Sequence, residues 1–184
     1  MRRPVNGIDA HPLLGRPFPE PMALADLDEY DLDGILCHLA PALAQESQDF
    51  AKLLERQRQG ATERDQARSF QRMFEPLLLH WQTAGEGLEG LESWPAFQGR
   101  VERCLRQLTD RPGRGRRVIA FTSGGFIGTV VQLVLGAPSC AALEINWRIR
   151  NAALTEFVFT RERITLDVFN SVADFPDREL LTYR

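Results

Sequence analysis

The most constraining feature of the sequence is a short apolar run that leads directly into a pair of glycines. Residues 118–122 read Val-Ile-Ala-Phe-Thr, a composition typical of a strand buried on both faces. Residues 123–125, Ser-Gly-Gly, follow as a tight turn, and residues 126–135 form an apolar helical stretch that ends at Gly136, with Pro138 just beyond. This order predicts one strand–turn–helix unit of an α/β domain.

The turn at 122–125 is a candidate anion-binding site. Thr122 and Ser123 would supply hydroxyls at the carboxyl edge of the predicted sheet, while Gly124 and Gly125 would let a ligand approach the backbone closely. The helix that follows would direct its free N–H groups and the positive end of its dipole to the same place, which favours phosphate. The alternative left open is that the glycines serve only a tight turn and close helix–strand packing.

The same residues argue against a dinucleotide fingerprint. The G-x-G-x-x-G pattern needs glycine where the chain has Ser123, and the related G-x-x-G-x-x-G pattern needs it at Thr122. Glu144, the candidate acidic partner, falls in the middle of a predicted strand. Too few residues follow the turn to build the remaining strands of such a sheet.

A helical region is expected before this unit, from about residue 33 to residue 110. Its apolar residues recur three and four positions apart, and Ser47, Thr62 and Ser93 stand where helix N-caps are expected. Residues 1–24 are rich in proline and predict an irregular lead-in.

The sequence after the turn predicts further strands. Residues 142–147 have a strand-like pattern, and residues 154–160 and 163–169 predict a hairpin. With 184 residues the chain is long enough for one domain. We therefore expect a single α/β domain over residues 1–184, with a mixed sheet and a sheet-forming core at 117–170.

The charge balance bears on partners and location. The net charge is −3, so there is no basic excess of the kind that nucleic-acid binding requires, although seven consecutive residues, 111–117, hold four arginines. That run precedes its strand and predicts a solvated loop at the amino edge. The most apolar stretch, residues 126–137, is too short to span a membrane, and no apolar leader is visible, so we expect a cytoplasmic protein without membrane contact.

Cysteine and histidine give no sign of a metal or a redox centre. The three cysteines, Cys37, Cys104 and Cys140, match no zinc or C-x-x-C spacing and predict buried thiols in a reducing compartment. None of the three histidines has a ligand partner at metal-binding spacing. We expect no cofactor and no metal.

Four motifs in order give the chain a resemblance to a known family. They are the apolar strand with Ser-Gly-Gly and the helix ending in Leu135-Gly136, the run Asn151-Ala-Ala-Leu-Thr155, the acidic Leu27-Asp28-Glu29, and Glu92-Ser-Trp-Pro-Ala-Phe-Gln-Gly-Arg-Val101. In their order and spacing along the chain, these motifs resemble those of the histidine phosphatase superfamily, the phosphoglycerate-mutase-like proteins, from about residue 24 to residue 170. The resemblance implies a three-layer sandwich with a mostly parallel sheet.

The resemblance also implies phosphoryl transfer through a phosphohistidine. In that family a histidine of an Arg-His-Gly motif attacks phosphorus, a second histidine and arginines hold the transferred group, and a glutamate protonates the leaving oxygen. Glu29 matches the position of the acid, and Ser123 stands at the position of the second histidine. By the same match, Thr122, Ser123, Gly124 and Gly125 would bind the phosphate of a small phosphorylated molecule or inorganic phosphate.

One element of the family pattern is missing from the printed sequence. No histidine here has arginine before it and glycine after it, so the nucleophile and its strand are absent, and the protein is expected to be impaired as a phosphatase. The alternative is a non-catalytic module that binds phosphate or a partner. A gene start placed too far downstream, a degenerate paralogue, and a homodimer or second chain that completes the sheet all stay open.

Overall fold

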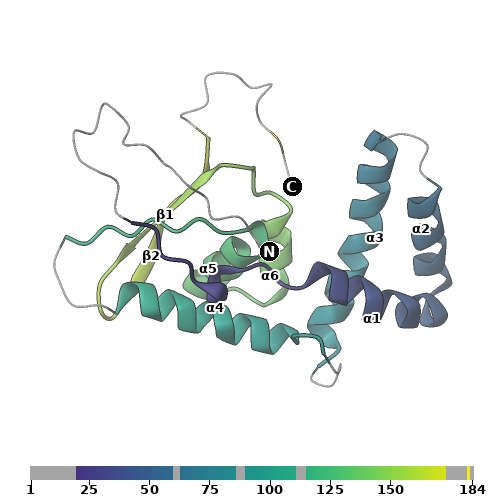
Figure 1. Ribbon diagram of the computed structural model, residues 1–184, viewed down its shortest axis with the longest axis horizontal. Helices are drawn as coiled ribbons and strands as arrows, with labels where there is room; N and C mark the ends of the chain where they lie inside the picture. The colour runs from purple at the N-terminus through teal and green to yellow at the C-terminus, as the bar shows by residue number, and fades with distance from the viewer. Residues whose placement is uncertain (1–19, 60–62, 86–89, 111–114, 173–181, 183–184) are drawn as a thin grey trace.

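The structure is a computed structural model that describes residues 20–59, 63–85, 90–110, 115–172 and 182. A 3-10 helix and six α-helices precede two strands: η1 (Ala25–Leu27), α1 (Leu32–Glu46), α2 (Gln48–Arg58), α3 (Glu63–Thr83), α4 (Trp94–Thr109), α5 (Gly124–Leu135), α6 (Cys140–Asn146), β1 (Leu154–Phe159) and β2 (Ile164–Ser171). Figure 1 shows α1, α2 and α3 at one end of the molecule and the strands toward the other, with α4, α5 and α6 between them.

Two of the predicted helix caps are confirmed. The Ser47 hydroxyl accepts a hydrogen bond from the Phe50 N–H at 3.2 Å at the start of α2, and Ser93 accepts one from the Ala96 N–H at 3.3 Å at the start of α4. Both bonds satisfy N–H groups that a helix leaves without partners in its first turn. Thr62, the third expected cap, lies outside the described residues.

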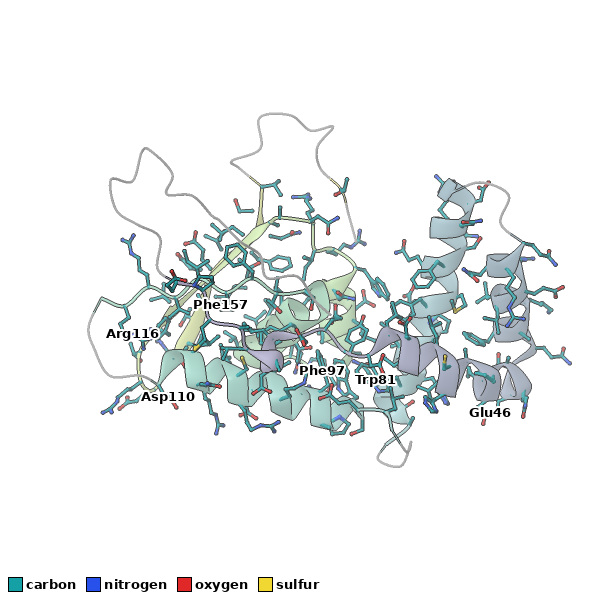
Figure 2. All side chains as sticks on the ribbon, in the orientation of Figure 1. Glu46, Trp81, Phe97, Asp110, Arg116 and Phe157 are labelled. Atoms are coloured by element: carbon teal, nitrogen blue, oxygen red, sulfur yellow. The ribbon has the colours of Figure 1, made fainter. Side chains whose placement is uncertain are left out.

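Aromatic side chains form the centre of the core. Tyr30 lies against Trp81 and Phe97 with ring centroids 5.2 and 5.6 Å apart, and Trp94 lies 5.2 Å from Trp81. These rings come from α3, from α4 and from the segment before α1, and Figure 2 labels Trp81 and Phe97 where the helices meet. Each such residue removes 150–250 Å² of surface from water in general terms, so this cluster ties the helical end to α4.

Residues 142–147 are helical, so the strand expected there is wrong. Residues 142–146 belong to α6, whose Ala142, Leu143 and Asn146 are buried at helical spacing, and Trp147 is its C-cap. A Cβ added to Gly128 of α5 would lie 2.6 Å from the Ala142 carbonyl oxygen. The lack of a side chain at Gly128 therefore allows α5 and α6 to pack closely.

The predicted hairpin is confirmed. β1 and β2 pair antiparallel, with Phe159 opposite Ile164 next to the turn. The Thr160 N–H donates to the Arg163 carbonyl at 2.8 Å and closes that turn. The burial of β1 and β2 alternates along each strand, as expected for a sheet with one solvated face.

Residues 118–122 are extended, but the expectation of a strand buried on both faces is wrong. They belong to no sheet in the described part of the chain, and Ile119 and Phe121 are 67% and 75% exposed. The described residues form one antiparallel pair of strands and no parallel pair. The local pattern specified an extended backbone, but a strand also requires a neighbour that supplies hydrogen bonds.

The three cysteines differ in their surroundings. Cys104 is buried, as expected, whereas Cys37 and Cys140 are exposed, so the prediction of three buried thiols is wrong for two of them. Over the residues that the structure describes, no helix is both long enough and apolar enough to cross a membrane.

Candidate active site

The predicted turn lies at the N-terminus of α5. Ser123 is the N-cap residue, and Gly124 and Gly125 are the first two residues of the helix, both buried. The Ser123 side chain makes no capping bond, and its Oγ is buried without a hydrogen-bond partner among the described residues. Helix N–H groups and a hydroxyl without a hydrogen-bond partner among the described residues thus meet at one place.

Glu29 reaches this helix terminus from the other end of the sequence. Its Oε2 accepts a hydrogen bond from the Gly125 N–H at 3.2 Å, and its Oε1 accepts one from the Tyr30 N–H at 3.3 Å. A carboxylate at the first turn of a helix is stabilised by the helix dipole and by the N–H group that it satisfies. The residue expected as the acid and the turn expected to bind the anion are therefore in direct contact.

Gly125 permits this contact because it has no side chain. A Cβ at this position would lie 2.2 Å from Glu29 Oε1 and 2.4 Å from Cε1 of the Tyr30 ring. Real atoms do not approach so closely, so any larger residue would push the carboxylate or the ring away. The sequence analysis expected the glycines to let an external ligand approach the backbone. In the structure, the group that approaches Gly125 is the Glu29 carboxylate of the same chain.

Thr122 fixes the turn to the same segment. Its Oγ1–H donates to the Leu27 carbonyl oxygen at 2.6 Å. The hydroxyl proton is therefore used within the protein, and Thr122 Oγ1 has no proton left to donate to an anion. Thr122 lies beside the α5 terminus, and its observed contact is structural.

Arg100 of α4 holds the segment that carries Glu29, a role that the sequence reasoning did not assign. Its guanidinium donates to both carboxylate oxygens of Glu92 at 2.8 Å, and its Nη1 donates to the carbonyl oxygens of Asp26 at 3.0 Å and Asp28 at 2.8 Å. Glu92 raises the pKa of Arg100 through this hydrogen-bonded pair. In the sequence, the feature that could have indicated this pair is the spacing of Glu92 and Arg100 within the motif at Glu92–Val101.

The remaining candidates lie apart from the turn. His38 is exposed on α1, and His80 is partly buried on α3, while His11 lies outside the described residues. No group of three or more metal-binding side chains occurs in the described ranges. Within the 111–117 run the structure describes Gly115, Arg116 and the exposed Arg117, and Figure 2 labels Arg116 at the opposite end from Glu46.

A shallow polar hollow is present on the surface of α3. It is lined by Arg68, Gln71, Arg72 and Glu75, all of one helix. The candidate active site lies at the N-terminus of α5, on another helix, so this hollow is a separate surface feature.

Comparison with known proteins identifies the family. The family model described as histidine phosphatase superfamily (branch 1) matches residues 38–172, which include the 122–125 turn and exclude Glu29. No curated protein and no solved structure matches the chain. Because the match covers well over half of the sequence, the expected resemblance is confirmed, and the chain belongs to the histidine phosphatase superfamily.

Proposed function

We propose that the α5 terminus is a phosphate site of the histidine phosphatase type in which Glu29 is the acid. The ancestral chemistry is hydrolysis or transfer of a phosphomonoester, and the sequence as printed is impaired in it. The observation that carries this proposal is the hydrogen bond between the Glu29 carboxylate and the Gly125 N–H, which joins an acid to an anion-binding helix terminus.

The available groups define what the site can and cannot do. The N–H groups of α5 and the unpartnered Ser123 hydroxyl would stabilise negative charge on a phosphoryl oxygen. Glu29, when protonated, would donate its proton to the leaving oxygen. The printed sequence supplies no histidine in an Arg-His-Gly context to attack phosphorus, so substrate would be held without the nucleophile that the family uses.

The observed position of Glu29 also affects binding. An ionised carboxylate on the Gly125 N–H occupies a donor that a phosphate would use and repels its negative charge. For unit charges about 4 Å apart this repulsion is on the order of 1 kcal/mol in water, which corresponds to a factor of about five in affinity. We therefore expect Glu29→Gln to bind inorganic phosphate about fivefold more tightly than the wild type.

Binding is tested by thermal unfolding in increasing inorganic phosphate. The wild type should be stabilised, Glu29→Gln should be stabilised at lower phosphate, and Ser123→Asp, which places a negative charge in the site, should lose the effect. The controls are Glu144→Gln and Ser139→Asp, the same substitutions at exposed positions on or beside α6. Absence of stabilisation in both wild type and Glu29→Gln, or equal stabilisation in Ser123→Asp, would contradict the phosphate site.

Activity is tested with p-nitrophenyl phosphate. We expect the 184-residue chain to show no turnover above that of Glu29→Gln, whereas a version extended upstream by an in-frame Arg-His-Gly segment, where the gene encodes one, should be active and should lose activity on Glu29→Gln. Robust turnover by the printed chain would show that a nucleophile other than the family's histidine operates.

A second candidate function is a non-catalytic module that binds an anion or a partner chain. It is favoured by serine at position 123, which brings no positive charge, and by the exposure of Ile119 and Phe121 on an extended segment beside the site. A homodimer or a second chain that supplies a strand to residues 118–122 would cover these side chains. Sedimentation of the wild type and of Ile119→Asp distinguishes the cases: a dimer or complex that the substitution dissociates supports the module.

A further inference from the structure

The segment that carries Glu29 is held at three consecutive carbonyl groups by side chains from two other parts of the chain. Arg100 of α4 donates to the carbonyl oxygens of Asp26 and Asp28, and Thr122 donates to the carbonyl oxygen of Leu27 between them. Glu29 is the next residue along the chain, and its carboxylate meets the Gly125 N–H. Short, well-directed bonds to successive peptide groups fix the direction in which the following side chain leaves the backbone.

The Arg100 guanidinium is itself fixed. Its Nε and Nη2 form a paired contact with the two oxygens of Glu92, and its central carbon lies 4.9 Å from the centroid of the Phe97 ring. Its side chain is 14% exposed and that of Glu92 is 27% exposed, so solvent competes little for the guanidinium. A planar donor with a charged partner on one edge and two carbonyls on the other can take only one orientation, which a lysine cannot reproduce.

We propose that Arg100 is the positioning residue for Glu29. Through the carbonyl groups of Asp26 and Asp28 it sets the Glu29 carboxylate over the first turn of α5, and Glu92 holds Arg100 in the orientation that does so. The catalytic or binding meaning of this role rests on the proposed function, whereas the positioning itself is a property of the fold.

The test compares Arg100→Lys with a matched control on the same helix. Arg106→Lys makes the same substitution two turns further along α4, where the arginine pairs with Glu102 at the surface and touches nothing of the site. The readout is the amide proton shift of Gly125 in ¹⁵N-labelled protein, because this N–H donates to the Glu29 carboxylate. Glu29→Gln calibrates the shift that follows when the charged acceptor is removed.

The expected result has two parts. Arg100→Lys moves the Gly125 amide resonance most of the way toward its position in Glu29→Gln, and Arg106→Lys leaves it unchanged. In the Glu29→Gln background, Arg100→Lys has little further effect on the Gly125 resonance, because the carboxylate that it positions is already gone.

Two outcomes would overturn the proposal. One is a folded Arg100→Lys protein whose Gly125 amide resonance stays at the wild-type position. The other is an Arg100→Lys substitution that shifts the Gly125 resonance equally in the wild-type and in the Glu29→Gln background. If Arg100→Lys does not fold, Glu92→Gln is used instead, since it keeps the arginine and weakens only the group that orients it; the same shift is expected and the same outcomes apply.

The phosphate titration is run on the same proteins to separate this proposal from the proposed function. If phosphate binds, Arg100→Lys should change its affinity in the wild-type background and not in Glu29→Gln. If phosphate binds none of the proteins, the proposed function fails, while the Gly125 shift still decides whether Arg100 positions Glu29.

Discussion

Replacement of Gly125 by alanine is the most direct test of the close packing at the α5 terminus. The added Cβ would lie 2.2 Å from Glu29 Oε1 and 2.4 and 2.9 Å from two carbons of the Tyr30 ring. Tyr30 is 4% exposed and lies against Trp81 and Phe97, so the ring has little room to move. The carboxylate is the more mobile neighbour, and its displacement breaks its bond to the Gly125 N–H.

The net cost follows from three contributions. Overpacking against a buried ring costs about 1–3 kcal/mol, and the lost hydrogen bond costs about 1 kcal/mol. Alanine in place of glycine returns at most about 1 kcal/mol of helix propensity, and less than that so close to a helix terminus. We expect Gly125→Ala to lower the free energy of unfolding by about 2 kcal/mol, which lowers Tm by about 4–8 °C in a protein of this size.

The control is Gly99→Ala in the interior of α4. There a Cβ would meet only the mobile end of the Arg103 side chain, at 3.3 Å, so the same substitution should stabilise the protein by about 0.5–1 kcal/mol. Urea unfolding followed by tryptophan fluorescence measures both variants. If Gly125→Ala is as stable as the wild type while Gly99→Ala behaves as expected, the packing of Glu29 and Tyr30 around Gly125 is wrong.

Three further substitutions test other contacts. Thr122→Val keeps the shape of the side chain but leaves the Leu27 carbonyl without its donor, and should cost about 1 kcal/mol in urea unfolding; no loss would mean that the 2.6 Å bond contributes nothing. Gly128→Ala brings a Cβ to 2.6 Å from the backbone oxygen of Ala142 and should cost about 2–3 kcal/mol, and an unchanged midpoint would contradict the close approach of α5 and α6. Burial raises the pKa of the Tyr30 phenol above its usual value, so the unfolded chain loses this proton first as the pH rises and the stability present below about pH 10 falls above it. Tyr30→Phe should therefore reduce the alkaline loss, measured by urea unfolding from about pH 8 to about pH 11, and an identical loss in the variant would refute this cause.

Local signals in the sequence were sufficient where a helix or hairpin depends on neighbouring residues. Ser47 and Ser93 cap helices because their hydroxyls bond to N–H groups three residues ahead, and the hairpin closes across the short turn after Thr160. The same kind of reasoning failed at residues 142–147. Their apolar residues suit a strand, but their burial on one side against Gly128 of α5 is a tertiary effect that favours a helix.

The sequence indicated candidate residues for the site but not how they are arranged in space. The family motifs indicated Glu29 and the 122–125 turn, but their contact joins residues 96 positions apart, which no local pattern specifies. For the same reason the sequence could not show that the carboxylate itself occupies the Gly125 N–H. Nor could it show that Arg100 donates hydrogen bonds to the backbone carbonyl groups of the segment before Glu29.

The exposed apolar stretch before α5 has a consequence for how the protein behaves in solution. Val118, Ile119 and Phe121 lie open on an extended backbone, which is the arrangement from which intermolecular β-aggregation starts. The exposed Arg117 stands directly before them, and a charge in this place opposes such stacking, because like charges brought together in a growing stack repel one another. Since salt screens that repulsion, high ionic strength should promote precipitation of this protein, and purification is best carried out in dilute buffer.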